Sequence, residues 1–166
     1  QGMGEFYYKN EIDFRDLVHF SAQTMGDMNP VPYPRTDRCL VPIGGGKDSV
    51  TTAQLLAEHD IPFHAFTMGS SQIQAQGIAA LGVPWKQIER QLDPLMLIRS
   101  KAKEVYNGHV PVSLTYFFTS LLMAVLEDYR FVVFSNEASS NAGNVSYLGM
   151  EINHQWSKSL ECEQLV

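Results

Sequence analysis

The residues best suited to chemistry follow an apolar stretch at 39–43, where the chain reads Gly-Gly-Gly-Lys-Asp-Ser over residues 44–49. Glycines adopt backbone angles closed to other residues and leave their N–H groups open to a ligand. The helix that we expect over residues 47–59 adds unpaired N-terminal donors and the positive end of its dipole. Three glycines between a strand and a helix therefore predict an anion site, most simply a phosphate site.

Two familiar glycine loops do not fit these positions. A Walker A loop needs a glycine where Val41 stands and a serine or threonine where Asp48 stands. The dinucleotide fingerprint needs a third glycine at Ser49 and an acidic residue about 20 positions further on, where residues 67–71 contain none. We therefore expect no nicotinamide cofactor.

The segment instead resembles the pyrophosphate loop of the ATP pyrophosphatase (PP-loop) superfamily, Ser-Gly-Gly-X-Asp-Ser, with Gly44 at the position of the first serine. Members of that superfamily cleave ATP to AMP and pyrophosphate, usually by adenylating a substrate oxygen. The resemblance implies that ATP and Mg²⁺ bind here, although the missing serine removes one hydroxyl contact. The residues that we assign to the nucleotide are Gly44, Gly45, Gly46, Lys47, Asp48 and Ser49, together with Thr67 and Met68 at the end of the second expected strand.

The elements that must position this loop alternate along the chain. We expect strands at 39–43, 63–68, 85–90 and 130–134, with helices between them. This order predicts an α/β fold, a doubly wound parallel sheet of the adenine nucleotide alpha hydrolase type with helices on both faces. Ligands of such sheets bind at the carboxyl ends of the strands, so the segment after the fourth strand should open beside the glycine loop.

Two of the expected helices precede the fourth strand. An Asp93-Pro94 start and apolar residues at helical spacing predict a helix to Tyr106, ended by Asn107-Gly108, with one face buried. Residues 114–126 are apolar enough for a buried helix and too short to cross a bilayer.

Polar residues gather in three segments after the third strand. Residues 135–144 contain too few apolar side chains for a core element. Within this segment, Glu137 offers a carboxylate that, with Asp48, could hold Mg²⁺. Residues 150–159 concentrate an acid, amides, an imidazole, an indole and an amine, and residues 108–113 add a further histidine. A solvated loop of turn formers is the alternative for the first segment, and a structural role is the alternative for a lone histidine or lysine. The substrate-binding candidates are Asn136, Asn141, Asn144, Asn153 and Gln155, and the catalytic candidates beside Asp48 are His154, Lys158 and His109.

The amino-acid composition limits the kinds of protein that this chain can be. A chain of 166 residues that is 45% hydrophobic and 18% charged suits a globular domain. A net charge of −6 without a basic cluster disfavours nucleic-acid binding and leaves a polar small molecule as the expected ligand. Two cysteines are too few for a disulfide framework, and no signal sequence opens the chain, so we expect a cytoplasmic protein that does not enter a membrane.

The organisation of the chain is predicted as a lead-in over residues 1–38 and a PP-loop domain over residues 39–166. The lead-in carries aromatic residues, among them Phe6 and Phe20, whose apolar side we expect to cover the sheet, and a proline-rich extended connector follows at 29–34. Because the sequence starts at Gln1 and lacks a clear closing element, we expect a further domain or segment of the same protein.

Taken together, four motifs resemble a narrower family, the UDP-N-acetylmuramoyl-L-alanyl-L-glutamate epimerases. They are Gly-Gly-Gly-Lys-Asp-Ser, Gly-His-Val-Pro, Ser-Asn-Glu with its asparagine-rich loop, and Asn-His-Gln-Trp-Ser-Lys-Ser, spread over residues 39–161. The resemblance implies an ATP-dependent isomerase of peptidoglycan precursor synthesis that adenylates the terminal L-glutamate of a UDP-muramoyl dipeptide and inverts it to D-glutamate. AMP and pyrophosphate would be released.

Other functions stay open at this point. A tRNA-modifying or thiolating PP-loop enzyme would need a basic face and often paired cysteines, which the chain lacks. A sulfonucleotide reductase would need a catalytic cysteine near the C-terminus, which the Glu-Cys-Glu run at 161–163 resembles only faintly. A nucleotide-sensing module without turnover would keep the sheet and ATP binding, but would not need Asp48 and Glu137 together.

Overall fold

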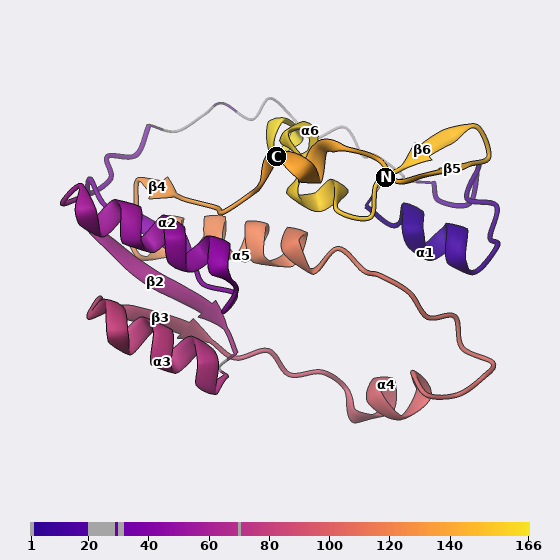
Figure 1. Ribbon diagram of the computed structural model, residues 1–166, viewed down its shortest axis with the longest axis horizontal. Helices are drawn as coiled ribbons and strands as arrows, with labels where there is room; N and C mark the ends of the chain where they lie inside the picture. Colours follow the sequence, from indigo (N-terminus) through magenta and orange to yellow (C-terminus); the bar gives the residue numbers. More distant parts are fainter. Residues whose placement is uncertain (1, 20–28, 30–31, 70) are drawn as a thin grey trace.

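A four-stranded parallel sheet lies toward one end of the computed structural model, on the left in Figure 1, and the structure describes residues 2–19, 29, 32–69 and 71–166. The strand order is β3-β2-β1-β4, and Cys39 at the start of β1 is paired with both Phe63 and Phe131. The predicted α/β alternation and parallel sheet are thus confirmed. The strands are β1 (Cys39–Pro42), β2 (Phe63–Met68), β3 (Trp85–Ile88) and β4 (Phe131–Val132).

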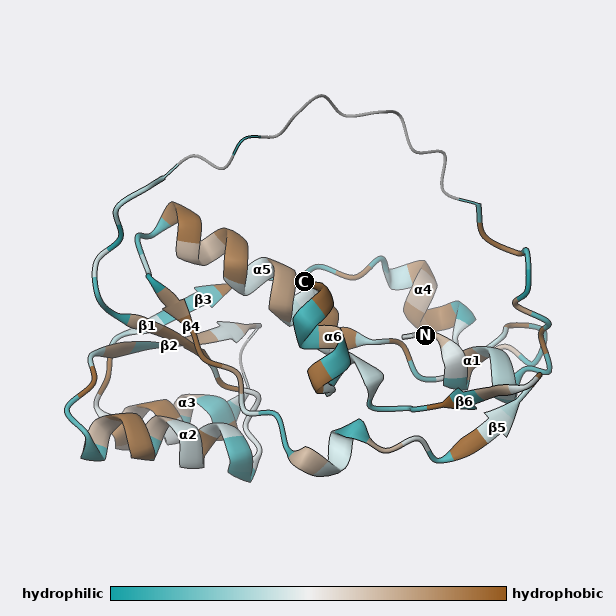
Figure 2. Cartoon of the chain, turned by 90° about the horizontal axis from the view of Figure 1, so that it is seen from above, coloured by the Kyte–Doolittle hydropathy of each residue, from teal (hydrophilic) through white to brown (hydrophobic). Residues whose placement is uncertain are grey.

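Helices cover both faces of the sheet, as predicted. Helices α2 (Lys47–Glu58) and α3 (Gln72–Leu81) lie on one face, and α5 (Val112–Leu126) lies on the other (Figures 1 and 2). Successive side chains of a strand point to opposite faces, so β1 contributes to two separate cores. The core under α2 and α3 contains Cys39, Val41, Ile43, Ala53, Phe63, Ala65 and Ile78, and the core under α5 contains Leu40, Phe66, Ala124 and Tyr129.

Helix α4 (Pro94–Arg99) is shorter than the predicted helix. It begins as expected, because the Asp93 carboxylate accepts a hydrogen bond from the N–H of Leu95 at 2.8 Å. It ends because the Ser100 hydroxyl donates to the carbonyl of Leu97, and the carbonyl of Ser100 accepts from the Asn107 amide at 2.9 Å. The prediction of a buried face is wrong, because α4 has no buried residue among those described.

Helix α5 packs on the sheet with one side only. Ser120 and Ala124 are buried against the sheet, whereas Phe118 and Leu122 are each 58% exposed. The prediction of a buried helix is therefore wrong for the outer side of α5, which Figure 2 shows as hydrophobic along most of its length. Among the described residues, no helix is both long and apolar enough to span a membrane.

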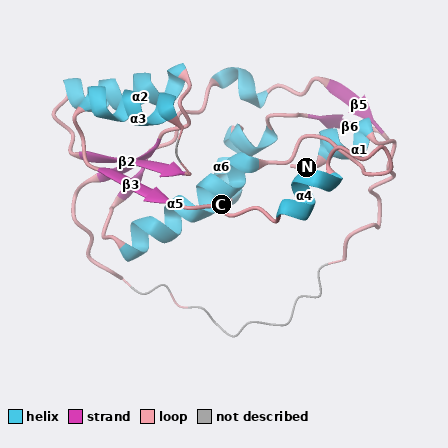
Figure 3. Ribbon diagram, turned by 90° about the horizontal axis from the view of Figure 1, so that it is seen from below, coloured by secondary structure: helices cyan, strands magenta, loops and turns pink. Residues whose placement is uncertain are grey.

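The N-terminal part of the lead-in, from Gly4 to Phe14, contacts a small hairpin. Helix α1 (Gly4–Lys9) is beside the antiparallel strands β5 (Val145–Tyr147) and β6 (Met150–Ile152), away from the four-stranded sheet that it was predicted to cover (Figures 1 and 3). Tyr8 and Phe14 pack on Tyr147 with ring centroids 5.6 and 6.2 Å apart. Phe20 and part of the proline-rich connector lie outside the described residues, and the boundary at residue 38 stays a prediction.

The C-terminal segment connects the hairpin to the sheet. A 3-10 turn η1 (Ala138–Asn141) precedes the hairpin, and a second turn η2 (Trp156–Lys158) with helix α6 (Leu160–Leu165) follows it. The turn η2 contacts α5, η1 and α6, which returns the end of the chain to the edge of the sheet where β1 and β4 finish.

Candidate functional site

The glycine loop joins β1 to α2 with its face open. The ladder between β1 and β2 runs on to Ile43, whose N–H donates to the carbonyl of Phe66 at 2.8 Å. The chain then turns at Gly45, where φ is +86°, and enters α2 from Gly46. A Cβ placed at Gly44 or Gly46 would have no neighbour within 4 Å, and no described side chain caps α2. The N-terminal donors of α2 are thus accessible to a ligand.

Buried contacts from α3 hold this loop from behind. The Gln74 amide donates to the carbonyl of Ile43 at 3.0 Å, and its oxygen accepts from the N–H of Ser71. A Cβ at Gly45 would lie 3.4 Å from Cγ of Gln74. On the α2 side, the Ser49 hydroxyl donates to the carbonyl of Gly46 at 3.0 Å. These hydrogen bonds support the conformation of the loop from both sides.

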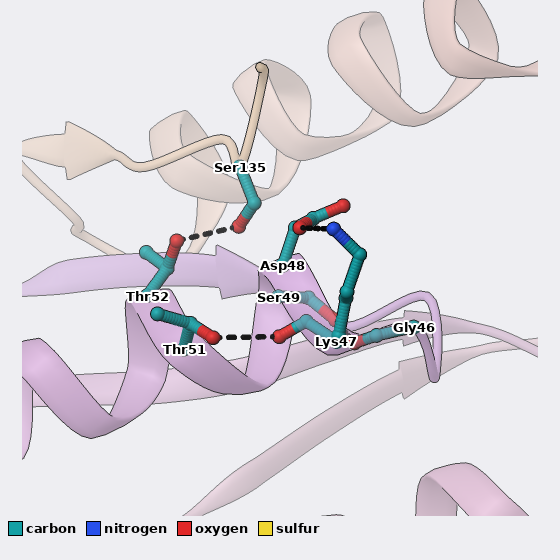
Figure 4. Close-up of polar contacts among 7 residues, drawn as sticks. All are labelled: Gly46, Lys47, Asp48, Ser49, Thr51, Thr52 and Ser135. Carbon is teal, nitrogen blue, oxygen red and sulfur yellow. Dashed lines mark hydrogen bonds and ion pairs between the residues drawn. The ribbon is translucent and has the colours of Figure 1, made fainter.

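The charged groups of the loop face solvent and are paired with each other. Nζ of Lys47 lies 3.1 Å from Oδ1 of Asp48, and the two side chains are 83% and 49% exposed (Figure 4). The hydrogen bond to Asp48 raises the pKa of Lys47, and the charges of Asp48 and then Glu137 add to the effect. An exposed pair of this kind is worth little energy, so a ligand can separate it at low cost.

A pocket of about 300 Å³ opens beside the loop. The end of β1, the first turn of α2, the first turn of α5, the exit of β4 and η2 all contribute to its wall. The Ser135 hydroxyl donates to Oγ1 of Thr52 at 2.8 Å and so joins the exit of β4 to α2 (Figure 4). The prediction that this exit opens beside the glycine loop is confirmed. The lining residues are Pro42, Gly44, Gly46, Asp48, Ser49, Ser113, Tyr116, Phe134, Ser135, Asn136 and Lys158.

Lys158 is the catalytic candidate that the fold brings to this pocket. It lies 110 positions after Asp48 in the sequence, yet both line the same pocket. His109 and His154 are not among the lining residues. The charges of both histidines add to the effect of the Lys9 hydrogen bond, which lowers the pKa of Glu5 on α1. Of the three candidates that accompany Asp48, Lys158 is therefore the one that lines this pocket, and a catalytic role for each of them stays a prediction.

Most of the predicted substrate-binding amides have partners within the C-terminal segment. Oδ1 of Asn141 accepts from the N–H of Leu160 at 2.7 Å, and Nδ2 of Asn153 donates to the carbonyl of Ser140 at 2.7 Å. In the same way, Asn144 accepts from the N–H of His154, and Gln155 accepts from the Ser140 hydroxyl. These bonds give the four side chains a structural role, and substrate binding by them stays a prediction.

A second cavity of about 510 Å³ lies between α1, the hairpin and η2. Asn141 and Asn153 line it beside the aromatic rings of Tyr7, Phe14 and Trp156. Trp156 and Lys158 are the two ends of η2, so this turn contributes one residue to each of the two pockets.

The remaining candidates lie near the loop in different settings. Thr67 is fully buried, and its hydroxyl accepts a hydrogen bond from Nε1 of Trp85 at 3.0 Å, so its side chain serves the core. Met68 ends β2 half-buried, with its carbonyl 3.5 Å from the Tyr116 hydroxyl. Glu137 is exposed one residue after Asn136. Nucleotide binding by Thr67 and Met68 stays a prediction.

The described residues contain no group of three or more His, Cys, Asp or Glu side chains arranged to hold a metal. Mg²⁺ at phosphate sites needs only one or two carboxylates, since phosphate oxygens and water complete its shell. Asp48 inside the pocket and Glu137 beside it fit that donor set.

Sequence reasoning did not select Ser113 and Tyr116, which enter the pocket from the first turns of α5. The segment 108–113 had been singled out for His109, but the residue that reaches the pocket is four positions later. The available signal was the helix start after Pro111, since a helix N-terminus at the carboxyl edge of a sheet faces the ligand crevice.

The comparisons with known proteins agree on one family. The model of the MurL N-terminal domain family matches residues 1–166. A UDP-N-acetyl-alpha-D-muramoyl-L-alanyl-L-glutamate epimerase from Xanthomonas oryzae pv. oryzae is 32% identical over 163 residues, which cover 98% of this chain and 36% of the relative. Proteins of the same name from Salinispora tropica and a Micromonospora species are each 31% identical over the whole chain and over 36% and 37% of their own lengths. The chain thus spans little more than a third of these relatives.

Proposed function

The chain belongs to the MurL N-terminal domain family, and from this premise we propose that it is the ATP-binding part of an epimerase acting on UDP-MurNAc-L-Ala-L-Glu. Its relatives carry the name of that epimerase, an isomerase. The observation that carries the proposal is the single pocket in which the open glycine loop, Asp48 and Lys158 meet.

The loop is suited to the pyrophosphate portion of ATP. The accessible N–H groups at the start of α2 and the positive end of its dipole attract a phosphate, and the Ser49 hydroxyl adds a donor. The first turn of α5 brings the Ser113 hydroxyl to the opposite wall. Asp48, with Glu137 nearby, would hold Mg²⁺, which neutralises phosphate charge when bound. Lys47 would leave Asp48 and pair with phosphate.

Adenylation gives the inversion its chemical basis. An ionised carboxylate resists loss of the neighbouring α-proton, because the carbanion would form beside an existing negative charge. Transfer of AMP from ATP to the α-carboxylate of the terminal glutamate removes that charge and acidifies the α-hydrogen. Removal of this proton from one face and its return to the other inverts the centre, and hydrolysis then frees AMP.

Lys158 is our first candidate for the group that moves the α-proton, because it lines the same pocket as the glycine loop. His154 and His109 remain the second and third candidates. The cavity at the other end of η2 supports a substrate that extends away from the reacting carboxylate, with Asn141 and Asn153 beside it.

The proposal is tested by measuring release of AMP and pyrophosphate from ATP and Mg²⁺ by the full-length protein, with and without UDP-MurNAc-L-Ala-L-Glu. We expect release that requires the dipeptide nucleotide, together with inversion of its glutamate. Asp48→Ala should lower the rate about 100-fold or more, whereas Glu58→Ala at the far end of α2 should not. Tight ATP binding with no cleavage would instead favour a nucleotide sensor.

The same reaction run in D₂O tests the assignment of the base. Inversion should place deuterium at the α-carbon of the product glutamate. Lys158→Met should suppress that incorporation while ATP binding persists, and His154→Gln is the matched comparison. Full incorporation by Lys158→Met would remove this residue from the proton-transfer step.

A further inference from the structure

Helix α5 carries two apolar stripes, and the sheet covers only one of them. The covered side contains Ser120 and Ala124, and Tyr116 and Met123 pack beside them. The outer side repeats apolar residues at i, i+3, i+4, i+7 and i+8, the spacing that marks a helix face made for packing. This outer stripe consists of Phe118, Leu121, Leu122, Val125 and Leu126, which are between 37% and 72% exposed.

Single exposed apolar side chains are common, but a continuous stripe of five is not. A helix that is apolar on all sides is normally buried on all sides. In Figure 2 the outer side of α5 is hydrophobic and faces away from the sheet, with α2 and α3 on the opposite face. The described elements therefore leave this helix half packed.

The accessible surface of the whole chain is also larger than that of a self-contained monomer. A self-contained monomer of 18.6 kDa should expose about 8,200 Å², whereas this chain exposes 11,772 Å². The thirteen residues outside the description would account for about 2,100 Å² of the excess even if they were as exposed as an unfolded chain. About 1,400 Å² remains, which exceeds the roughly 800 Å² that each partner buries in a standard interface.

The relatives indicate what covers this surface. The chain spans 36% to 37% of their lengths and corresponds to their N-terminal domain. We propose that the outer stripe of α5 is the surface on which the remainder of the full-length polypeptide docks. The first turns of the same helix place Ser113 and Tyr116 in the glycine-loop pocket, so the docked part would lie next to the site.

Cysteine labelling in the full-length protein tests this proposal. Phe118→Cys and Leu122→Cys place a thiol on the stripe, and Glu58→Cys places one on the exposed polar side of α2 as the matched control. The native Cys39 and Cys162 are buried. Maleimide modification is followed by mass spectrometry of the peptide that contains each position, over a tenfold range of protein concentration, and the mass of the native particle is measured by light scattering.

We expect the stripe positions to be modified about tenfold more slowly than position 58, or slower still, at every concentration and in a monomeric particle. Modification at the control rate would overturn the proposal. Protection that is lost on dilution as a dimer dissociates would overturn it as well, because the occupant would then be a second copy of the chain. Neither the labelling rate nor the particle mass depends on ATP cleavage, so the docking proposal and the proposed function can be refuted independently of each other.

Discussion

Gly45 is the position in the glycine loop where a side chain has the highest expected cost in stability. Its φ of +86° is strained for any residue with a Cβ, and that Cβ would contact Cγ of Gln74 at 3.4 Å. We expect Gly45→Ala to lower the free energy of unfolding by about 1–3 kcal/mol. Gly44→Ala is the control, because its Cβ would enter open space. Urea denaturation followed by circular dichroism measures both, and equal costs would contradict the strained turn.

His64 couples the stability of the sheet to pH. Its Nδ1 lies 2.6 Å from the hydroxyl of the buried Tyr129. Burial lowers the pKa of His64 below its ordinary value of 6.5, and the charges of Arg38 and Lys86 lower it further against an opposing effect of Glu127. The unfolded chain therefore takes up a proton more readily than the folded protein as the pH falls below 6.5.

We expect the contribution of neutral His64 to the free energy of unfolding to be fully present above pH 6.5. It should decline as the pH falls toward the lower pKa of the folded state. His64→Asn should flatten this part of the profile, because the Asn side chain can accept from Tyr129 but does not titrate there. His59→Asn, which keeps His64, should retain the decline. Urea midpoints between about pH 7.5 and 5 test the prediction, and an unchanged slope in His64→Asn would refute it.

At the scale of elements, the glycine loop depends on α3. Gln74 is 8% exposed and bonds both the carbonyl of Ile43 and the N–H of Ser71. Gln74→Met fills a similar volume and leaves the carbonyl of Ile43 without this hydrogen-bond donor. We expect it to lower the free energy of unfolding by about 1–3 kcal/mol. Gln76→Met, on the exposed side of the same helix, should change the free energy of unfolding by no more than about 0.5 kcal/mol. We also expect weaker ATP binding by Gln74→Met, measured by calorimetry.

The elements that frame the site could be predicted from the sequence because their limits are local. Strand β2 begins after Pro62 and ends before Gly69, and α2 follows the three glycines. The extent of α4 could not be predicted, because its end depends on the bond from Asn107 to the carbonyl of Ser100. Apolar periodicity continues through that point and carries no information on the bond.

The candidate site, like the fold, could be predicted from the sequence only in part. The loop could be located from the sequence because three glycines after an apolar stretch mark a turn from a strand to a helix, and the ligand that it binds stays a prediction. The amides of the C-terminal segment could not be assigned, because the same side chains can bind a ligand or join backbone segments. Here Asn141 and Asn153 join η1 to the residues that follow the hairpin. That Lys158 rather than His154 lines the pocket follows from the path of the chain through the hairpin, which no local pattern specifies.

At the scale of the whole molecule, the pocket depends on segments far apart in the sequence. The loop at 44–49 and the turn η2 meet across it, and η2 also contacts α5. A ligand that binds both sides should therefore slow opening of both at once. We predict that ATP with Mg²⁺ slows amide hydrogen exchange of the full-length protein in residues 44–49 and 155–160 together. The exposed helix α4 does not line this pocket and serves as the internal control.

The two segments should also respond together to a change in either one. Asp48→Ala should abolish the protection by ATP in both, because the loop would no longer hold the metal and phosphate on which contact with η2 depends. Lys158→Met should leave most of the protection at 44–49 and reduce it at 155–160, since the amides of the loop bind phosphate without the lysine. Exchange measured by mass spectrometry resolves the two peptides. Protection confined to 44–49 in the parent protein would mean that the nucleotide does not reach η2, and the proton-transferring group would then have to come from another part of the full-length protein.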